Sequence, residues 1–348
     1  MNSKMVITTG DPAGIGPEIT VKALQQLSGS HEVTYIVISD RCAIDDAMRF
    51  VRSPLTVREI QSPEEALNEP GVLNLIDLDC LHGKMCPYGQ VSAQAGDAAF
   101  RYIVHGIELA SAGRVDAVVT GPINKEAIHL AGHNFAGHTE IFAHYTNTAN
   151  VTMLLSSKQL RVVHVTTHVS MEDACRLIQK DRVLKTIRLA QEGMQLLGVE
   201  QPKIAVAGFN AHCSENGLFG HQEEDAIIPA VEAAKTEGIN ADGPIPPDTI
   251  FVKAAAGMFD VVVAMYHDQG HIPLKLLGFR MDAESNTFSA MSGINCTLGL
   301  PFVRTSVDHG TAFDRAGKNI SNPESMVEAI EAAGTMSINM KNIRRKRQ

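Results

Sequence analysis

Residues 5–18, MVITTGDPAGIGPE, join a strand-like run to the start of a helix. The run Met5–Thr9 is apolar and β-branched, which is typical of a short buried strand. Pro17 suits a first helical turn, because proline lacks an N–H that would be unpaired there. The glycines allow close backbone approach, and a helix N-terminus can face an anion. A tight turn without a ligand would have the same features, and the loop is neither G-x-G-x-x-G nor G-x-x-x-x-G-K-[ST].

The same alternation of strand and helix patterns continues along the chain. Further strands are predicted at Thr34–Ser39, Val115–Thr120, Val162–Thr167, Lys203–Ala207 and Val261–Tyr266. Helices are predicted at Pro17–Leu27, Ala93–Ala112, Met171–Leu197 and Glu223–Thr236. This order predicts an α/β fold. The 348 residues suggest about two domains, although no break in composition marks a boundary between them.

Composition excludes several classes of protein. Apolar residues make up 44% of the chain, which is too many for a disordered protein. The net charge of −9 disfavours binding to nucleic acid. The six cysteines are scattered without a C-x-x-C pair, which argues against a disulfide scaffold. No apolar run approaches the roughly 18 residues of a membrane span, and the N-terminus has no signal-peptide pattern. We therefore expect a cytoplasmic protein that contacts neither membrane nor nucleic acid.

Three histidines follow three predicted strands. His168 comes after Val162–Thr167, His212 after Lys203–Ala207 and His267 after Val261–Tyr266. The carboxyl ends of parallel strands share one edge of a sheet, where ligands bind. Converging imidazoles are suitable ligands for a divalent metal ion. Three separate histidines, each hydrogen-bonded in its own loop, would give the same pattern, because the separations match no short metal motif.

Four longer motifs resemble the 4-hydroxythreonine-4-phosphate dehydrogenase family. They are Gly10–Glu18, Gly137–Glu140, Tyr266–Gly270 and Gly299–Thr311. Three further segments are closer to its 4-phospho-D-threonate and D-erythronate dehydrogenase subgroup, namely Asn124–Asn134, Glu215–Gly220 and His271–Phe279. The resemblance covers nearly the whole chain. It implies an isocitrate/isopropylmalate-dehydrogenase-like fold, with residues 1–348 as one family domain. Within it, two α/β subdomains would interleave around a central cleft. The N- and C-terminal parts of the chain would form the cofactor-side subdomain, and roughly the middle of the chain would form the dimerisation subdomain.

The resemblance also implies a homodimer whose active site lies at the subunit interface, with NAD and one divalent metal ion (Zn, Mg, Mn or Co). The implied metal ligands are His168, His212 and His267. The implied substrate-binding residues are His138, Thr139, Lys275, Asn295 and Arg304. The implied cofactor-binding residues are Gly14, Ile15, His309, Gly310, Thr311 and Asp314.

Two segments depart from the family pattern. The family usually has Asn-Pro-His-Ala where this chain has Asn210-Ala211-His212-Cys213, so Cys213 is a candidate extra ligand. The segment between Lys275 and Asn295 is longer than usual. This insertion, at about residues 280–294, is either a surface loop or a change in the shape of the substrate pocket.

The expected reaction is metal-dependent oxidation by NAD of the 3-hydroxyl of a 4-phosphorylated hydroxy acid, followed by decarboxylation of the β-keto acid. The substrate would be 4-phospho-D-threonate or 4-hydroxy-L-threonine 4-phosphate. Candidates for the proton acceptor are Lys125, Asp248 and Asp268, although either aspartate could instead orient a histidine. The alternatives are a dehydrogenase of a cyclic dihydrodiol carboxylate, a three-histidine zinc hydrolase and a silent phosphate-binding module.

Overall fold

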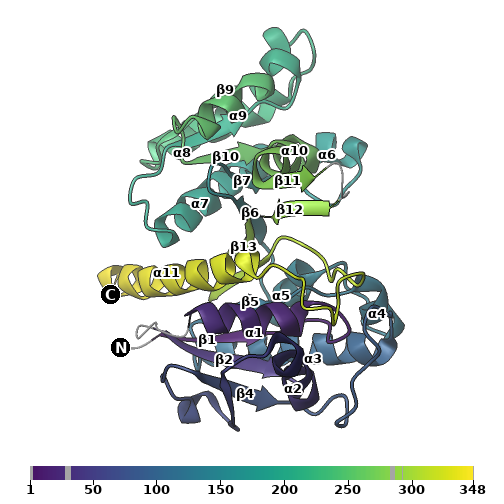
Figure 1. The fold of residues 1–348 in the computed structure, drawn as a ribbon. Coiled ribbons are helices and arrows are strands. Elements are labelled where there is room, and N and C mark those ends of the chain that lie inside the picture. The colour runs from purple at the N-terminus through teal and green to yellow at the C-terminus, as the bar shows by residue number, and fades with distance from the viewer. Residues whose placement is uncertain (1–2, 28–32, 283–286, 292, 348) are drawn as a thin grey trace. The chain divides into compact units, whose positions relative to one another are not determined.

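The computed structural model describes residues 3–27, 33–282, 287–291 and 293–347. The chain divides into two compact units (Figure 1). The terminal unit comprises Met1–Val151 and Leu300–Gln348, and the middle unit comprises Thr152–Gly299. Each unit is an α/β structure with its own apolar core.

The terminal unit contains a parallel sheet with the strand order β3-β4-β2-β1-β5-β14. The strands are β1 (Ser3–Thr8), β2 (Val33–Ser39), β3 (Thr56–Glu59), β4 (Val72–Asp77), β5 (Ala117–Thr120) and β14 (Val303–Val307). The inner strands are buried along almost their whole length, because helices cover both faces. The edge strand β3, by contrast, is largely exposed.

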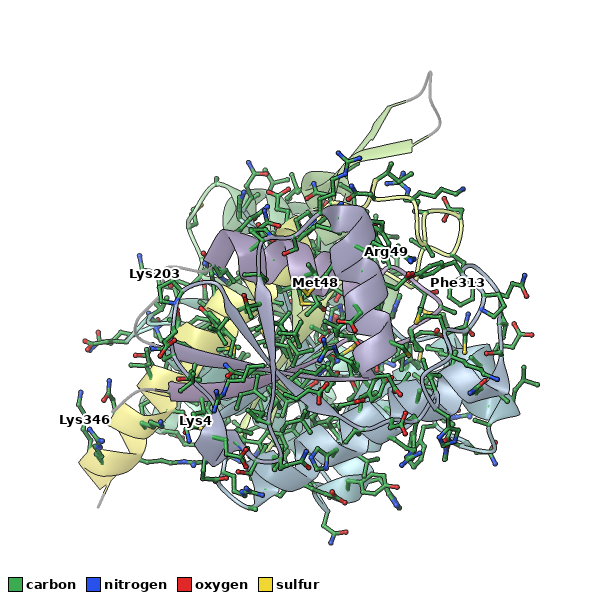
Figure 2. The ribbon with its side chains drawn as sticks, turned by 60° about the horizontal axis from the view of Figure 1, so that its bottom comes forward. Lys4, Met48, Arg49, Lys203, Phe313 and Lys346 are labelled. Atoms are coloured by element: carbon green, nitrogen blue, oxygen red, sulfur yellow. The ribbon has the colours of Figure 1, made fainter. Side chains whose placement is uncertain are left out.

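The helices of the terminal unit are α1 (Gly16–Leu27), α2 (Arg41–Val51), α3 (Ala93–Ser111), α4 (Lys125–Leu130), α5 (His138–Tyr145) and α11 (Glu324–Arg347), with a short 3₁₀ turn η1 (Pro63–Glu65). Successive strand residues point to opposite faces. On β1, Val6 belongs to the core that includes Ile103 of α3, and Met5 faces Gly334 of α11. The side chain of Asn319 donates to the carbonyl of Phe50 on α2 at 3.1 Å. Met48 and Arg49 of the same helix are labelled in Figure 2.

The sheet of the middle unit has the strand order β13-β6-β7-β10-β8-β9. The strands are β6 (Thr152–Ser156), β7 (Arg161–His164), β8 (Ile204–Ala207), β9 (Ala241–Ile245), β10 (Val261–Ala264) and β13 (Ile294–Leu298). Strands β7, β10, β8 and β9 are parallel, whereas β6 runs antiparallel to both β7 and β13. The carboxyl ends of β7, β10 and β8 therefore lie next to one another at one edge of this sheet.

The remaining elements of the middle unit cover this sheet and extend from it. They are α6 (Met171–Leu177), α7 (Lys180–Leu196), α8 (Ile228–Thr236), α9 (Pro247–Ala255), α10 (His267–Gly278), the 3₁₀ element η2 (Ala211–Glu215), the π-turn η3 (Glu223–Ile227), and strands β11 (Phe279–Asp282) and β12 (Thr287–Met291). Strands β11 and β12 form a separate antiparallel two-stranded sheet that overlaps the predicted 280–294 insertion (Figure 2). Residues 283–286 and 292 of that insertion lie outside the described part of the chain.

All six predicted strands and all four predicted helical segments are present, with two corrections. The predicted helix Met171–Leu197 is two helices, because Ile178 and Gln179 have extended backbones between α6 and α7. The predicted helix Glu223–Thr236 begins as the π-turn η3 before it becomes α8. A pattern based on strand–helix alternation does not find β6 and β13, since no helix separates β6 from β7.

Candidate active site

Two predicted cofactor segments meet in the terminal unit. The N–H of Ile15 donates to the carbonyl of Thr311 at 3.0 Å. A Cβ at Gly14 would lie 2.9 Å from the same oxygen, so only glycine permits this approach. The structure therefore brings Gly14, Ile15 and Thr311 together. His309, Gly310 and Asp314 lie on the second segment, and the side chain of Asp314 is 79% exposed.

The buried carboxyl group of Asp11 lies in the same loop as Gly14 and Ile15. In the sequence, only its position after a predicted strand indicated a functional residue. Its Oδ1 accepts the N–H of Ala13 at 2.8 Å, and its Oδ2 is sealed from solvent with no hydrogen-bond partner in the described structure. Burial raises the pKa of Asp11 to about 6, and the hydrogen bond from Ala13 opposes that rise. This carboxyl group therefore holds a proton more tightly than an exposed aspartate.

Three predicted substrate-binding residues also belong to the terminal unit. Arg304 is 1% exposed on β14, and its Nη2 donates to the Thr120 hydroxyl at 2.7 Å. Its guanidinium carbon lies 5.4 Å from the centre of the Phe142 ring. His138 begins α5 and Thr139 follows it. Strand β14 and helix α5, which are far apart in sequence, thus supply this cluster together.

The electrostatics of this cluster favour an anion. Burial lowers the pKa of His138 well below its usual value, and the charges of Arg304 and Lys125 lower it further. His138 is thus neutral beside two cations, and its Nε2 is sealed from solvent with no partner among the described residues. Lys125 begins α4, and its Nζ would be 4.0 Å from a Cβ at Gly137. Such a cluster can bind a phosphate or carboxylate group.

Of the three predicted metal ligands, two lie close together in the middle unit. The rings of His168 and His267 are 5.8 Å apart between centroids. His212 lies beyond the neighbouring strand β8, and its side chain is 60% exposed. Within the described ranges, no three His, Cys, Asp or Glu side chains of one chain are grouped closely enough to hold a metal ion. The sequence therefore predicted the shared sheet edge, and a complete ligand set would require a second subunit to contribute.

The two predicted aspartates each contact a predicted ligand. Asp268 Oδ1 lies 2.6 Å from Nδ1 of His267, which leaves Nε2 of that ring available for a metal ion. Asp248 Oδ2 lies 4.0 Å from Nδ1 of His212. Both carboxylates are more than half exposed. Their geometry suits the orientation of an imidazole better than proton transfer from a substrate.

The other two predicted substrate-binding residues are in the middle unit. Lys275 lies on α10, with Nζ 4.3 Å from the centre of the Phe279 ring. Asn295 lies on β13, where its Nδ2 is 3.3 Å from the Met153 sulfur and its Oδ1 is buried without a hydrogen-bond partner in the described structure. Cys213, the candidate extra ligand, is close to Gly208, and burial raises the pKa of its thiol to about 11. Cys213 belongs to no group of three potential metal-binding side chains among the described residues.

Two histidines that the sequence reasoning missed extend the pair of His168 and His267. The His271 ring stacks on the His267 ring at 3.7 Å, and the His164 ring lies 4.6 Å from His271. Burial lowers the pKa of His164 to about 3, and the neighbouring His271 and His267 contribute. The spacing of four residues between His267 and His271 in a helix was the available signal. Nothing in the sequence pointed to His164.

None of the described helices is both long enough and apolar enough to span a bilayer. The fold has a solved counterpart in the β-decarboxylating dehydrogenase of Thermococcus kodakarensis, with a TM-score of 0.51 over 97% of this chain and 84% of that chain at 12% identity. This likeness confirms the predicted α/β fold class, which the chain shares with this β-decarboxylating dehydrogenase.

The chain belongs to the family described as pyridoxal phosphate biosynthetic protein PdxA, whose model matches residues 31–333. It is 47% identical over 332 residues to D-threonate 4-phosphate dehydrogenase of Cupriavidus necator, covering 95% of this chain and 96% of that protein. It is 44% identical to 4-hydroxythreonine-4-phosphate dehydrogenase of Beijerinckia indica, covering 97% and 96%. The structure of 4-hydroxythreonine-4-phosphate dehydrogenase from Klebsiella pneumoniae has a TM-score of 0.82 at 43% identity, covering 97% and 98%. These relatives confirm the predicted family and identify the chain as an oxidoreductase.

Proposed function

We propose that this chain uses NAD and a divalent metal ion to oxidise the 3-hydroxyl of a 4-phosphorylated hydroxy acid. The β-keto acid formed then loses CO2. The observation that carries this proposal is the cluster formed by the buried Arg304, the exposed Lys125 and the neutral His138. The names of the two curated relatives point to 4-phospho-D-threonate and 4-hydroxy-L-threonine 4-phosphate as the substrates to test.

The cluster would bind the phosphate or carboxylate end of the substrate. Arg304 is fixed by Thr120 and by the Phe142 ring, so little conformational freedom is lost when an anion binds. His138 can donate or accept one hydrogen bond through Nε2 without adding charge. The hydroxyl of Thr139 would bind a neighbouring polar group of the substrate. Lys275 and Asn295, which lie in the middle unit, remain predicted substrate-binding residues. An anion held in this way presents its carbon chain in one orientation.

The cofactor would lie against the loops that meet at Ile15 and Thr311. Backbone groups without bulky side chains, as at Gly14 and Gly310, permit close approach of a nucleotide. His309 and Asp314 lie on the same segment and would contact the adenosine part of NAD. Hydride from carbon 3 of the substrate would pass to the nicotinamide ring.

The divalent metal ion would be held by His168, His212 and His267, with ligands shared between the subunits of a homodimer. Asp268 supports this assignment, because its contact with Nδ1 of His267 leaves Nε2 as the nitrogen that can bind the metal ion. When bound, such an ion lowers the pKa of a substrate alcohol and stabilises negative charge on its oxygen. Asp248 would orient His212 only by charge, since its Oδ2 lies 4.0 Å from Nδ1, beyond hydrogen-bond distance. Lys125, the third candidate for the proton acceptor, is a cation in the anion-binding cluster and could accept the hydroxyl proton only after losing its own.

A homodimer is supported by apolar side chains exposed on two helices of the middle unit. On α10, Ile272 is 63% exposed and Leu276 is 79% exposed, and they share one face at a spacing of four residues. Met171 of α6 is 57% exposed. Burial of these side chains in a second copy would stabilise the dimer. Sedimentation velocity should give a dimer for the wild type and a monomer for Leu276→Lys.

We also propose that the enzyme works in the cytoplasm.

The proposed activity is tested by the appearance of NADH absorbance. The full chain is incubated with NAD, with Mg²⁺, Mn²⁺, Co²⁺ or Zn²⁺, and with each phosphorylated substrate in turn. A signal that a chelator abolishes, together with release of CO2, is the expected result. The same assay with NADP, and with a cyclic dihydrodiol carboxylate, determines the cofactor and the substrate class.

Arg304→Lys is the informative variant, because lysine keeps the charge but cannot retain the fixed fork of the guanidinium group. We expect its kcat/KM to fall about 100-fold, in line with about 3 kcal/mol for a charged hydrogen bond. Lys253→Arg on the exposed face of α9 is the matched control. The proposal is wrong if neither phosphorylated substrate reduces NAD. Metal-dependent ester hydrolysis without NADH would favour the zinc hydrolase.

A further inference from the structure

The predicted ligand His212 lies in a run of backbone that is unusual for residues other than glycine. His212, Cys213, Ser214, Glu215 and Asn216 have φ values of 50°, 57°, 62°, 45° and 59°. L-residues seldom adopt this left-handed conformation even singly, because Cβ crowds the following carbonyl oxygen. Such backbone persists only when the surrounding contacts hold it, and it is concentrated at functional sites.

The buried carboxylate of Glu223 holds the segment just before this run. Glu223 is 1% exposed. Its Oε1 accepts the N–H groups of Phe209 at 2.7 Å and of Asn210 at 2.8 Å. Its Oε2 accepts Nδ2 of Asn210 at 2.8 Å. Three hydrogen bonds thus converge on one carboxylate, two residues before His212. Charged acceptors of this kind form the stronger class of hydrogen bond.

The middle of the run is fixed by Ser214, which is 1% exposed. Its hydroxyl accepts the N–H of Gly217 at 3.0 Å, and its carbonyl accepts the N–H of Phe219 at 3.1 Å. His212 lies between these two anchored points with its side chain directed toward solvent and Asp248. The backbone at residue 212 is therefore determined by contacts that do not involve its own imidazole.

The glutamate also begins an unusual element. Glu223 is the first residue of the π-turn η3, which precedes α8. Single π-turns within helices occur frequently at functional sites. The neighbouring Gly208 lies so close that a Cβ would be 3.2 Å from Oε1 of Glu223 and 2.7 Å from the sulfur of Cys213. The end of β8, the left-handed run and the π-turn are thus packed around one carboxylate.

We propose that Glu223 is a positioning residue for His212: it fixes the left-handed turn that presents this imidazole for metal binding. The inference rests on the proposed function, because it takes His212 as a metal ligand. Without the carboxylate, the N–H groups of Phe209 and Asn210 lose their acceptor and the run is free to relax to right-handed backbone. The imidazole then leaves the position in which it binds metal.

The test measures Co²⁺ binding to the full chain without NAD or substrate. Co²⁺ is titrated up to millimolar concentration, and the visible absorbance of the bound ion reports binding. Glu223→Ala removes all three hydrogen bonds and should weaken Co²⁺ binding about 10- to 100-fold. Glu223→Gln keeps the acceptor for the two backbone N–H groups, and should restore most of the affinity. Glu232→Ala is the matched control, because Glu232 is exposed on α8 and pairs with Lys235.

A double-mutant cycle separates positioning from a general structural role. In a His212→Ala background, Glu223→Ala should change Co²⁺ affinity less than about twofold, because the imidazole it positions is absent. An equal loss in both backgrounds would refute the inference. So would an unchanged affinity in Glu223→Ala, or in His212→Ala alone. Circular dichroism shows whether Glu223→Ala folds. If it does not, the same cycle is performed with Glu223→Gln. This variant should lose a smaller part of the Co²⁺ affinity, and only when His212 is present. Failure of the folded wild type to bind Co²⁺ would instead refute the metal assignment of the proposed function.

Discussion

Replacing the buried Asp11 by asparagine should change how the stability of this protein depends on pH. The folded chain raises the pKa of this carboxyl from 3.8 to about 6. The folded state therefore binds this proton more tightly than the unfolded state. The stability that the protonated group contributes is fully present below pH 3.8 and is lost as the pH rises through about 6. Above that pH, the buried carboxylate destabilises the fold.

The size of the effect follows from the shift. One pKa unit corresponds to about 1.4 kcal/mol, so a rise of roughly two units corresponds to about 3 kcal/mol in the free energy of unfolding. About 2 kcal/mol of this is expected between pH 4.5 and 7.5, from the binding polynomial of one group. The side-chain oxygen of the new asparagine retains the acceptor for the N–H of Ala13, and the side chain carries no charge. The gain in stability of Asp11→Asn over the wild type should therefore grow by that amount across this range.

Urea unfolding at several pH values measures this difference. The chain has no tryptophan, so far-UV circular dichroism is the suitable signal. Asp242→Asn is the control, because Asp242 is exposed on the edge strand β9. Its difference from the wild type should stay within about 0.5 kcal/mol at every pH. A constant difference between Asp11→Asn and the wild type from pH 4.5 to 7.5 would refute the reasoning about burial.

Three substitutions in the terminal unit test its packing by the midpoint of urea unfolding. Gly96→Ala would place a Cβ 2.1 Å from the Ala127 carbonyl oxygen and push α3 away from α4. We therefore expect the free energy of unfolding to fall by about 3 kcal/mol. A midpoint equal to that of the wild type would contradict this contact. Tyr102→Phe removes the hydroxyl that donates to the buried Asp40 and should cost about 1–3 kcal/mol, whereas an unchanged midpoint would mean that water replaces it. Ser92→Ala removes the side chain that caps α3 and should cost about 1 kcal/mol, with Ser92→Asp as the variant expected to retain the midpoint.

Local patterns were sufficient to predict the strands that carry the candidate ligands. The run Val261–Ala264 is wholly apolar because β10 lies inside a sheet with helices on its faces, and the same holds for β8. The placement of His168, His212 and His267 after strand ends could therefore be predicted. That β7, β10 and β8 are neighbours could not, since their order differs from their order in the chain.

Features that depend on distant residues were not accessible from the sequence. The pairing of Arg304 with Thr120 joins β14 to β5 across 184 positions, and no local pattern encodes it. The burial of His164 and Asp11 depends on what packs over them, so their lowered and raised pKa values could not be anticipated. The left-handed conformation at His212 contradicts the preferences of the residues that adopt it, because contacts from Glu223 override them.

The terminal unit is assembled from two separate parts of the chain, and this has a consequence for biosynthesis. When residue 151 has left the ribosome, β5 still lacks its neighbour β14, and the face of β1 that α11 will cover is bare. About 150 more residues must be made before β14 follows, which takes roughly 10–30 s at about 5–20 residues per second. The middle unit is continuous and can complete its own sheet in that interval. A nascent chain thus carries an open sheet edge for nearly half of its synthesis, and an open edge is a site where another chain can pair.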